Sequence, residues 1–319
     1  MSKKEKVLVC GKLMLPQLRQ DLENEFDITL LVEQADAQAF LKEKGAEFTG
    51  LVTSAGVRTD AGVLDHLPNL RVVSSFGVGY DHLDEATLTA RALPVGYTPE
   101  VLNDCVADLA MGLMLDISRG LSAADRYVRQ GKWLSGPFTL QRRLSGKRLG
   151  ILGLGRIGEV IARRASGFDM EIGYHNRSRR DDVPHTWLSS PAELARWADY
   201  FMVAVTGGPA TAGLVDAAIL DALGPDGFLI NIARGSVIDE PALVKALQEK
   251  RIAGAALDVF VNEPNVPEAL MSLDNVVLLP HIASGTHETR RAMADLVMDN
   301  LRSFYATGSL KAPVPWSAG

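Results

Sequence analysis

The sequence predicts an α/β fold made of two doubly wound parallel sheets, and three observations support this. The length of 319 residues favours two domains of ordinary size. Short apolar runs alternate with helical patterns along almost the whole chain, which is typical of parallel strands joined by crossover helices. The segment Gly153-Leu-Gly-Arg-Ile-Gly158 follows one such run and opens a helical pattern, as a dinucleotide-binding turn requires.

The first third of the chain is expected to form a small α/β layer of its own. Its helices are expected near Leu15–Asn24 and Ala37–Lys44, and its strands at Val7–Cys10, Ile28–Val32, Gly50–Thr53 and Val72–Phe76. A long helix follows from Val101, with apolar residues at helical spacing. Its apolar face suits either core packing or a subunit interface.

Six strands are expected after the long helix, which matches a complete dinucleotide-binding domain. They are Leu149–Gly153, Glu171–Tyr174, Tyr200–Val205, Phe228–Ile232, Ala253–Leu257 and Val276–Leu279. The last segment, Glu288–Ala306, has helical periodicity and is expected to return to the first domain.

Composition and charge exclude several classes of protein. A formal net charge of −6 argues against nucleic-acid binding, which usually leaves a basic footprint. No run approaches the roughly 18 apolar residues of a membrane span. Cys10 and Cys105 provide no metal spacing and no disulfide framework, and we expect both to be buried and inert. The first residues lead into a strand-like run without a signal-peptide core, so a cytoplasmic location is expected.

The glycine-rich segment has a mechanical reason for each glycine. Gly153 permits the tight turn, Gly155 lets the backbone approach a pyrophosphate, and Gly158 allows close packing of helix on strand. Backbone N–H groups at the start of the helix then face the phosphates. The turn is completed by Leu154, Arg156 and Ile157, which we count with the coenzyme site.

The end of the second strand indicates which dinucleotide is bound. An NAD-preferring site usually has an acidic residue about 20 residues past the glycines, bonded to the ribose 2′-hydroxyl. That carboxylate is absent here, and Asn176, Arg177 and Ser178 occupy the region. A guanidinium and a hydroxyl suit a 2′-phosphate, so NADPH is predicted over NADH. Arg179 and Arg180 suit either phosphate binding or a solvated turn.

Three polar residues, Arg234, Glu263 and His281, each follow the end of a short apolar run. The carboxyl ends of strands in an open α/β sheet share one crevice, where ligands bind. A guanidinium, a carboxylate and an imidazole beside a dinucleotide site suit binding of an anionic substrate and transfer of a proton. The constellation predicts a hydride-transfer enzyme.

These motifs, in this order, resemble the D-isomer-specific 2-hydroxyacid dehydrogenase family, in particular its NADPH-dependent glyoxylate/hydroxypyruvate and hydroxyphenylpyruvate reductases. The resemblance covers nearly the whole chain. It implies a flavodoxin-like substrate domain (1–99 and 286–319) with a Rossmann NADP-binding domain (100–285) inserted into it. It also implies an active site in the cleft and a homodimer built on the nucleotide domains.

The resemblance also implies a role for each matching residue. His281 would be the general acid, Glu263 its partner that favours the protonated imidazolium, and Arg234 the clamp on the substrate carboxylate and carbonyl. The backbone N–H groups of Val78 and Gly79 would bind the carboxylate as well. Coenzyme contacts would also come from Thr206, Ile232, Ala233, Asp258, Ala283 and Ser284. No metal is implied, and Phe138 would reach the neighbouring subunit's site.

The predicted function is reduction of a small 2-oxoacid by NADPH, with glyoxylate and hydroxypyruvate as the leading substrates. Arylpyruvates remain an alternative because no motif defines the pocket for the substrate side chain. A D-3-phosphoglycerate dehydrogenase is a second enzymatic alternative. A coenzyme-sensing binding protein, like the family's transcriptional corepressors, is the alternative without catalysis.

Overall fold

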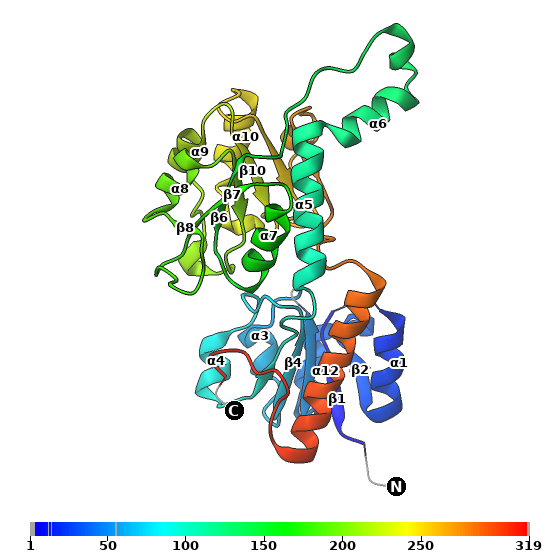
Figure 1. Cartoon of the computed structure of the whole chain (residues 1–319). Helices are drawn as coiled ribbons and strands as arrows, with labels where there is room; N and C mark the ends of the chain where they lie inside the picture. Colours follow the sequence, from blue (N-terminus) through cyan, green and yellow to red (C-terminus); the bar gives the residue numbers. More distant parts are fainter. Residues whose placement is uncertain (1–3, 12, 14, 55, 318–319) are drawn as a thin grey trace. The chain divides into compact units, whose positions relative to one another are not determined.

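The computed structural model describes residues 4–11, 13, 15–54 and 56–317 of the chain. These residues form two compact units, shown in Figure 1. The first unit comprises Met1–Leu102 and Thr286–Gly319, and the second comprises Asn103–Gly285. The first unit is therefore built from both ends of the sequence.

The first unit contains a sheet of five parallel strands in the order β2-β1-β3-β4-β5. This is the flavodoxin-like order, in which the direction of winding reverses between β1 and β3. The strands are β1 (Lys6–Val9), β2 (Asp27–Leu30), β3 (Gly50–Ser54), β4 (Val72–Phe76) and β5 (Val95–Gly96). Strands β1, β3 and β4 are almost wholly buried, as expected for parallel strands covered on both faces.

The carboxyl-terminal helix α12 (His287–Thr307) packs on β4 of the first unit. Ser74 in β4 donates a hydrogen bond to the carbonyl of Val297, and Asn300 donates to the carbonyl of Tyr97. Gly96 leaves room for this helix, because a Cβ there would lie 2.6 Å from the Asn300 amide. The other helices of the unit are α1 (Pro16–Glu25), α2 (Ala37–Lys44), α3 (Ala61–Leu64) and α4 (Glu85–Ala90).

The second unit contains seven parallel strands in the order β12-β11-β10-β9-β6-β7-β8. They are β6 (Arg148–Leu152), β7 (Glu171–His175), β8 (Thr186–Trp187), β9 (Tyr200–Val203), β10 (Phe228–Asn231), β11 (Gly254–Leu257) and β12 (Val276–Leu278). The prediction of two doubly wound parallel sheets is confirmed, but six strands were expected here. The additional strand is β8, whose two residues are too few to give a periodic pattern.

Helix α5 (Asn103–Arg119) is the long helix expected from the sequence, and its apolar face is buried within its own unit. It packs against α7 and strands β10, β11 and β12. Core packing therefore accounts for this face. The remaining helices are α6 (Leu121–Arg129), α7 (Arg156–Ser166), α8 (Pro191–Trp197), α9 (Ala217–Leu223), α10 (Glu240–Gln248) and α11 (Glu268–Met271).

Among the described residues, no helix combines the length and the apolar character that crossing a bilayer would require. Cys10 is buried, and burial raises the pKa of its thiol to about 12, which makes it inert at neutral pH. Cys105 is only half-buried, so the expectation that both thiols are fully buried was wrong for this one.

Candidate functional site

Arg234, Glu263 and His281 lie beyond the carboxyl ends of β10, β11 and β12, which are neighbouring parallel strands. The loops that carry Arg234 and Glu263 pack tightly together. A Cβ at Gly235 would lie 1.9 Å from the backbone carbon of Phe260, so only glycine fits there. The strand order thus brings together residues that are far apart in the sequence.

The imidazole of His281 pairs with the carboxylate of Glu263. Nδ1 of His281 lies 2.7 Å from Oε2 of Glu263, and the other carboxylate oxygen accepts the backbone N–H of Phe260 at 3.0 Å. The pKa of Glu263 is lowered overall. Burial raises it, but this effect is outweighed by the hydrogen bond and charge of His281, by the Phe260 N–H and by the charge of Arg234. The ionised carboxylate therefore holds the ring through Nδ1 and leaves Nε2 available.

The backbone at His281 has φ +53°, a left-handed conformation that residues other than glycine adopt rarely. Asp258 holds it in place. The Asp258 carbonyl accepts the His281 N–H at 2.9 Å, and its carboxylate accepts the N–H groups of Ile282 at 2.7 Å and Ala283 at 2.9 Å. The pKa of this fully buried carboxyl group is raised overall, because the effect of burial exceeds the opposing effect of the two backbone hydrogen bonds. Asp258 therefore fixes the backbone at His281, in addition to the coenzyme contact that the sequence predicts for it.

Arg234 is held by a residue that the sequence analysis did not single out. The buried side chain of Asn231 donates to the Arg234 carbonyl at 2.9 Å and accepts the Ala233 N–H at 3.0 Å. The guanidinium of Arg234 donates to the carbonyl of Ala233 at 2.8 Å. The position of Asn231 at the end of the apolar run Phe228–Asn231 could have indicated this role, because a buried amide must be hydrogen-bonded.

The glycine-rich turn joins β6 to α7. Gly153 has φ +99°, and a Cβ there would lie 2.8 Å from the backbone N of Val205. A Cβ at Gly158 would lie 2.6 Å from the carbonyl oxygen of Gly153. Beside Gly155 the space is open, and no side chain caps the start of α7. The first and third glycines serve the turn itself, whereas the second borders space that a ligand could occupy.

The polar segment after β7 divides into residues that point into the protein and residues that do not. The amide of Asn176 bonds both backbone groups of Leu154 in the glycine-rich turn. Arg180 forms ion pairs with Glu159 and Asp182, so the alternative of a simple solvated turn does not apply to it. Arg177 and Ser178 are exposed and have no hydrogen bond or ion pair with any other described residue.

The other predicted coenzyme residues follow strand ends of the same sheet. Thr206 is exposed in the loop after β9, and its carbonyl accepts a hydrogen bond from Thr211 at 2.7 Å. Ile232 and Ala233 are buried after β10, and after β12 Ala283 is buried while Ser284 is half-buried. All three strand ends belong to the second unit.

Val78 and Gly79 belong to the first unit, where they follow β4. The turn before them is fixed because Gly77 donates to Thr98 Oγ1 and accepts the Thr98 N–H, both at 3.0 Å. Within the described part of the chain, neither the Val78 nor the Gly79 N–H donates a hydrogen bond. Both groups therefore remain able to bind an anion.

A small apolar hollow lies at the carboxyl ends of β1, β3 and β4 in the first unit, and its free volume is about 20 Å³. Phe76, the last residue of β4, lines it and precedes Val78 by two positions. Its other lining residues are Cys10, Leu13, Leu15, Leu18, Val52, Thr53 and Ser54.

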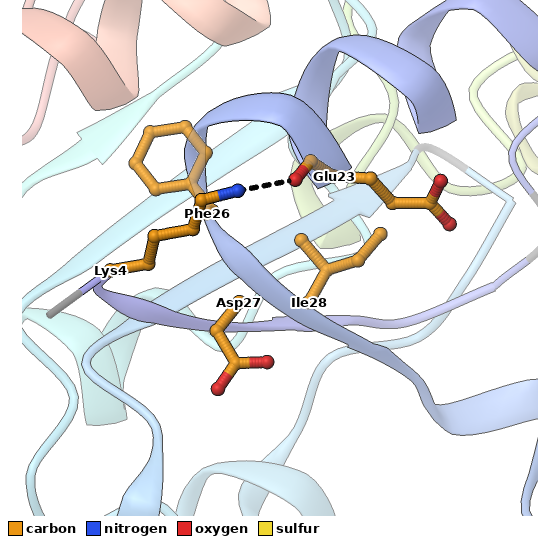
Figure 2. A pocket seen from close by; sticks show the side chains of 5 residues that line it. All are labelled: Lys4, Glu23, Phe26, Asp27 and Ile28. Atoms are coloured by element: carbon orange, nitrogen blue, oxygen red, sulfur yellow. Dashed lines mark hydrogen bonds between the residues drawn. The ribbon is translucent and has the colours of Figure 1, made fainter. Parts of the chain in front are cut away.

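A second hollow, drawn in Figure 2, lies at the opposite edge of the same sheet, beside the amino ends of β1 and β2. Lys4 crosses it and donates a hydrogen bond to the carbonyl of Glu23 at 2.8 Å. Ligands of parallel α/β sheets bind at the carboxyl edge, so this hollow is not a candidate site.

Comparison with known proteins agrees with this geometry. Residues 111–283 match the model of the D-isomer specific 2-hydroxyacid dehydrogenase NAD binding domain. The chain is 45% identical over 301 residues to both the hydroxyphenylpyruvate reductase of Plectranthus scutellarioides and the glyoxylate/hydroxypyruvate reductase A HPR2 of Arabidopsis thaliana, covering 94% of this chain and 96% of each relative. It is similar to the crystal structure of the NADPH-dependent glyoxylate/hydroxypyruvate reductase of Sinorhizobium meliloti in complex with NADP and malonate. That structure gives a TM-score of 0.94 and 43% identity, with 99% of this chain and 98% of that one covered. The chain belongs to the D-isomer-specific 2-hydroxyacid dehydrogenase family, as its motifs predict.

Proposed function

We propose that this protein is an NADPH-dependent reductase that converts small 2-oxoacids, glyoxylate and hydroxypyruvate above all, to D-2-hydroxyacids. The observation that carries the proposal is the pairing of His281 with Glu263 beside Arg234, in the same sheet as the glycine-rich turn. The similarity to the glyoxylate/hydroxypyruvate reductases of Arabidopsis thaliana and Sinorhizobium meliloti supports the same activity, whereas the similarity to the hydroxyphenylpyruvate reductase supports the arylpyruvate alternative.

The chain's residues fit the coenzyme at three places. The space beside Gly155 and the uncapped start of α7 suit a pyrophosphate, and the exposed Arg177 and Ser178 suit a 2′-phosphate. Thr206, Ile232 and Ser284, together with the buried residues beside them, are proposed to line the rest of the site. When bound, the reduced nicotinamide would supply the hydride.

The protein's own contribution is to bind the 2-oxoacid and to provide a proton. His281 is proposed as the general acid, and the proton comes from Nε2 because Glu263 already holds Nδ1. Arg234 is proposed to hold the carboxylate and polarise the carbonyl through charge-assisted hydrogen bonds. The N–H groups of Val78 and Gly79 are proposed to supply further donors to the same carboxylate.

Arylpyruvates remain the alternative substrates. One of the relatives quoted above is a hydroxyphenylpyruvate reductase, and neither the motifs nor the described residues define the pocket for the substrate side chain.

We also propose that the protein is a cytoplasmic homodimer joined through residues 120–143 of the second unit. In Figure 1 this segment, which includes α6, extends away from the end of α5. Helix α6 has no buried residue, and Leu134 and Leu140 are almost fully exposed. Apolar exposure on this scale is typical of a contact surface. The family resemblance implies a homodimer built on the nucleotide domains, so we propose that a second copy of the chain covers this segment.

Phe138 lies in this segment and packs edge-on against Tyr127, with 5.4 Å between ring centroids. We keep the hypothesis that it reaches the partner's active site. Phe138→Ala should change relative specificities among 2-oxoacids more than it changes coenzyme affinity. Leu134→Glu should convert the dimer to a monomer in sedimentation equilibrium, and a dimer that persists would contradict the proposed interface.

The decisive experiment is a panel of 2-oxoacids assayed in parallel with NADPH and NADH. The panel contains glyoxylate, hydroxypyruvate, 4-hydroxyphenylpyruvate and 3-phosphohydroxypyruvate. Higher kcat/KM for the first two, with NADPH, supports the proposal. Preference for the aryl or the phosphorylated substrate would favour the corresponding alternative enzyme, and NADPH binding without turnover of any substrate would favour a coenzyme sensor.

A further inference from the structure

Asn176 uses its whole side chain on the glycine-rich turn. Its Oδ1 accepts the N–H of Leu154 at 2.7 Å, and its Nδ2 donates to the Leu154 carbonyl at 3.2 Å. Leu154 is the residue between the first two glycines. A single amide therefore fixes the backbone of the turn from the end of the neighbouring strand.

Arg180 reaches the same turn from the other side of the loop. Its Nη1 donates to the Leu154 carbonyl at 3.2 Å and also binds Glu159 in the first turn of α7. Its Nε donates to Asp182 at 2.9 Å. The Arg180 backbone is held as well, because its N–H donates to the hydroxyl of Tyr174 at 2.8 Å.

The two other arginines of the loop are placed differently. Among the residues that the structure describes, Arg179 pairs only with Asp181, at 3.5 Å, and its side chain is 70% exposed, against 25% for Arg180. Arg177 is exposed and, within the described part of the chain, makes no ion pair or hydrogen bond. The three arginines of this loop, which look alike in the sequence, therefore differ in exposure and in the partners of their guanidinium groups.

The backbone N–H groups of Leu154 and Gly155, inside the turn, already have acceptors within the protein. The N–H of Leu154 is given to Asn176, and the N–H of Gly155 is given to the Gly153 carbonyl at 2.9 Å. Donors to a pyrophosphate must therefore come from the first turn of α7, whose leading N–H groups have no partner within the helix. Their direction depends on the turn that Asn176 and Arg180 hold.

We propose that Asn176 and Arg180 are positioning residues of the coenzyme turn, serving NADPH and NADH equally, whereas Arg177 alone among the loop arginines selects for the 2′-phosphate. The inference rests on the proposed coenzyme site. It goes beyond the sequence-based expectation, which counted Asn176 among the coenzyme residues without a defined role and left Arg180 open between phosphate binding and a solvated turn.

The test is a set of equilibrium dissociation constants for NADPH and NADH, measured by fluorescence titration without substrate. Asn176→Ala and Arg180→Met should each raise both constants about tenfold, since each loses hydrogen bonds worth about that factor, and should leave their ratio within about twofold. Arg179→Ala is the matched control and should change neither constant by more than about twofold. Selective loss of NADPH in Asn176→Ala or Arg180→Met would overturn the proposal.

Thermal unfolding without coenzyme separates positioning from a general loss of structure. Raised dissociation constants at a nearly unchanged unfolding midpoint are the expected result. A lowered midpoint with unchanged dissociation constants in both variants would overturn the positioning role.

Glu159→Gln provides a second test that keeps every arginine in place. It removes one of the two carboxylates that hold Arg180. If Arg180 were a phosphate ligand held in reserve, its release would improve NADPH affinity relative to NADH. We expect the ratio to stay within about twofold, and a shift of about fivefold or more towards NADPH would overturn the assignment.

Arg177→Ala distinguishes this inference from the coenzyme site on which it rests. Equal weakening of both coenzymes in Arg177→Ala would refute the proposed 2′-phosphate site. Equal weakening in Asn176→Ala and Arg180→Met would in that case still support their positioning role.

Discussion

Two regions of the second unit place their charged residues in opposite ways. They are the proposed catalytic edge at the ends of β10–β12 and the proposed coenzyme loop after β7. At the catalytic edge, charges from separate strands converge, and Glu263 responds to both His281 and Arg234. In the coenzyme loop, five consecutive polar residues point to different surroundings: Arg177 is exposed, whereas Arg180 pairs with Glu159. Convergence follows from strand order, whereas divergence follows from the local path of one loop.

The difference shows what a sequence motif can specify. A polar residue at the end of a parallel strand has a predictable location, because all carboxyl ends share one edge. Successive residues of a short loop have no such rule, and their roles depend on which carboxylates lie nearby. Glu159 and Asp182 decide the role of Arg180, and neither belongs to the polar motif.

The largest effect is expected from His281→Ala. Loss of a general acid typically lowers kcat by 10²–10⁴-fold, and we expect about 10³-fold, with the NADPH dissociation constant unchanged because the coenzyme loop is untouched. Steady-state kinetics and a binding titration measure the two quantities. His287→Ala is a matched control, since His287 is exposed at the start of α12. Near-normal turnover in His281→Ala would exclude it as the acid.

Most of the fold, and the meeting of His281 with Glu263 at the strand ends, could be predicted from the sequence for physical reasons. Parallel strands buried on both faces appear as apolar runs, and the residues after them must lie at one edge. Strand β8 could not be predicted, because its two residues give no period. Asn231, which holds the Arg234 loop, is part of a predicted strand, but only coordinates reveal which backbone groups its amide satisfies.

The second largest effect is expected from Asp258→Asn, which keeps the size of a fully buried side chain. An amide has one acceptor oxygen, so one of the N–H groups of Ile282 and Ala283 would face an NH₂ group. We expect kcat to fall about 100-fold through misplacement of His281, since small displacements of a catalytic group cost about that factor. Unchanged kcat would show that the left-handed backbone at His281 does not depend on this carboxylate.

Arg177→Ala should have a smaller and more selective effect. Loss of a charge-assisted bond to a phosphate is expected to weaken NADPH about 30-fold relative to NADH. The selectivity should also decrease with added salt in the parent enzyme, because the guanidinium is exposed. Dissociation constants for both coenzymes at low and high ionic strength provide the measurement. An equal loss for the two coenzymes would contradict the contrast between Arg177 and Arg180.

The smallest effect concerns stability and tests the electrostatic side of the catalytic edge. The pKa of Glu263 is lowered in the folded protein, so its ionised form adds stability above the ordinary titration range of the acid and loses it as pH falls through the lowered pKa. Glu263→Gln should therefore lower the unfolding midpoint at pH 6 by only about 2 °C, because a pair this exposed contributes about 1 kcal/mol at most. The difference should vanish at a pH below this lowered pKa, where the carboxylate is protonated in both states. A difference that persists at that pH would mean that the carboxylate stabilises its loop through the Phe260 N–H rather than through charge, and the convergence of charges at this edge would then serve catalysis alone.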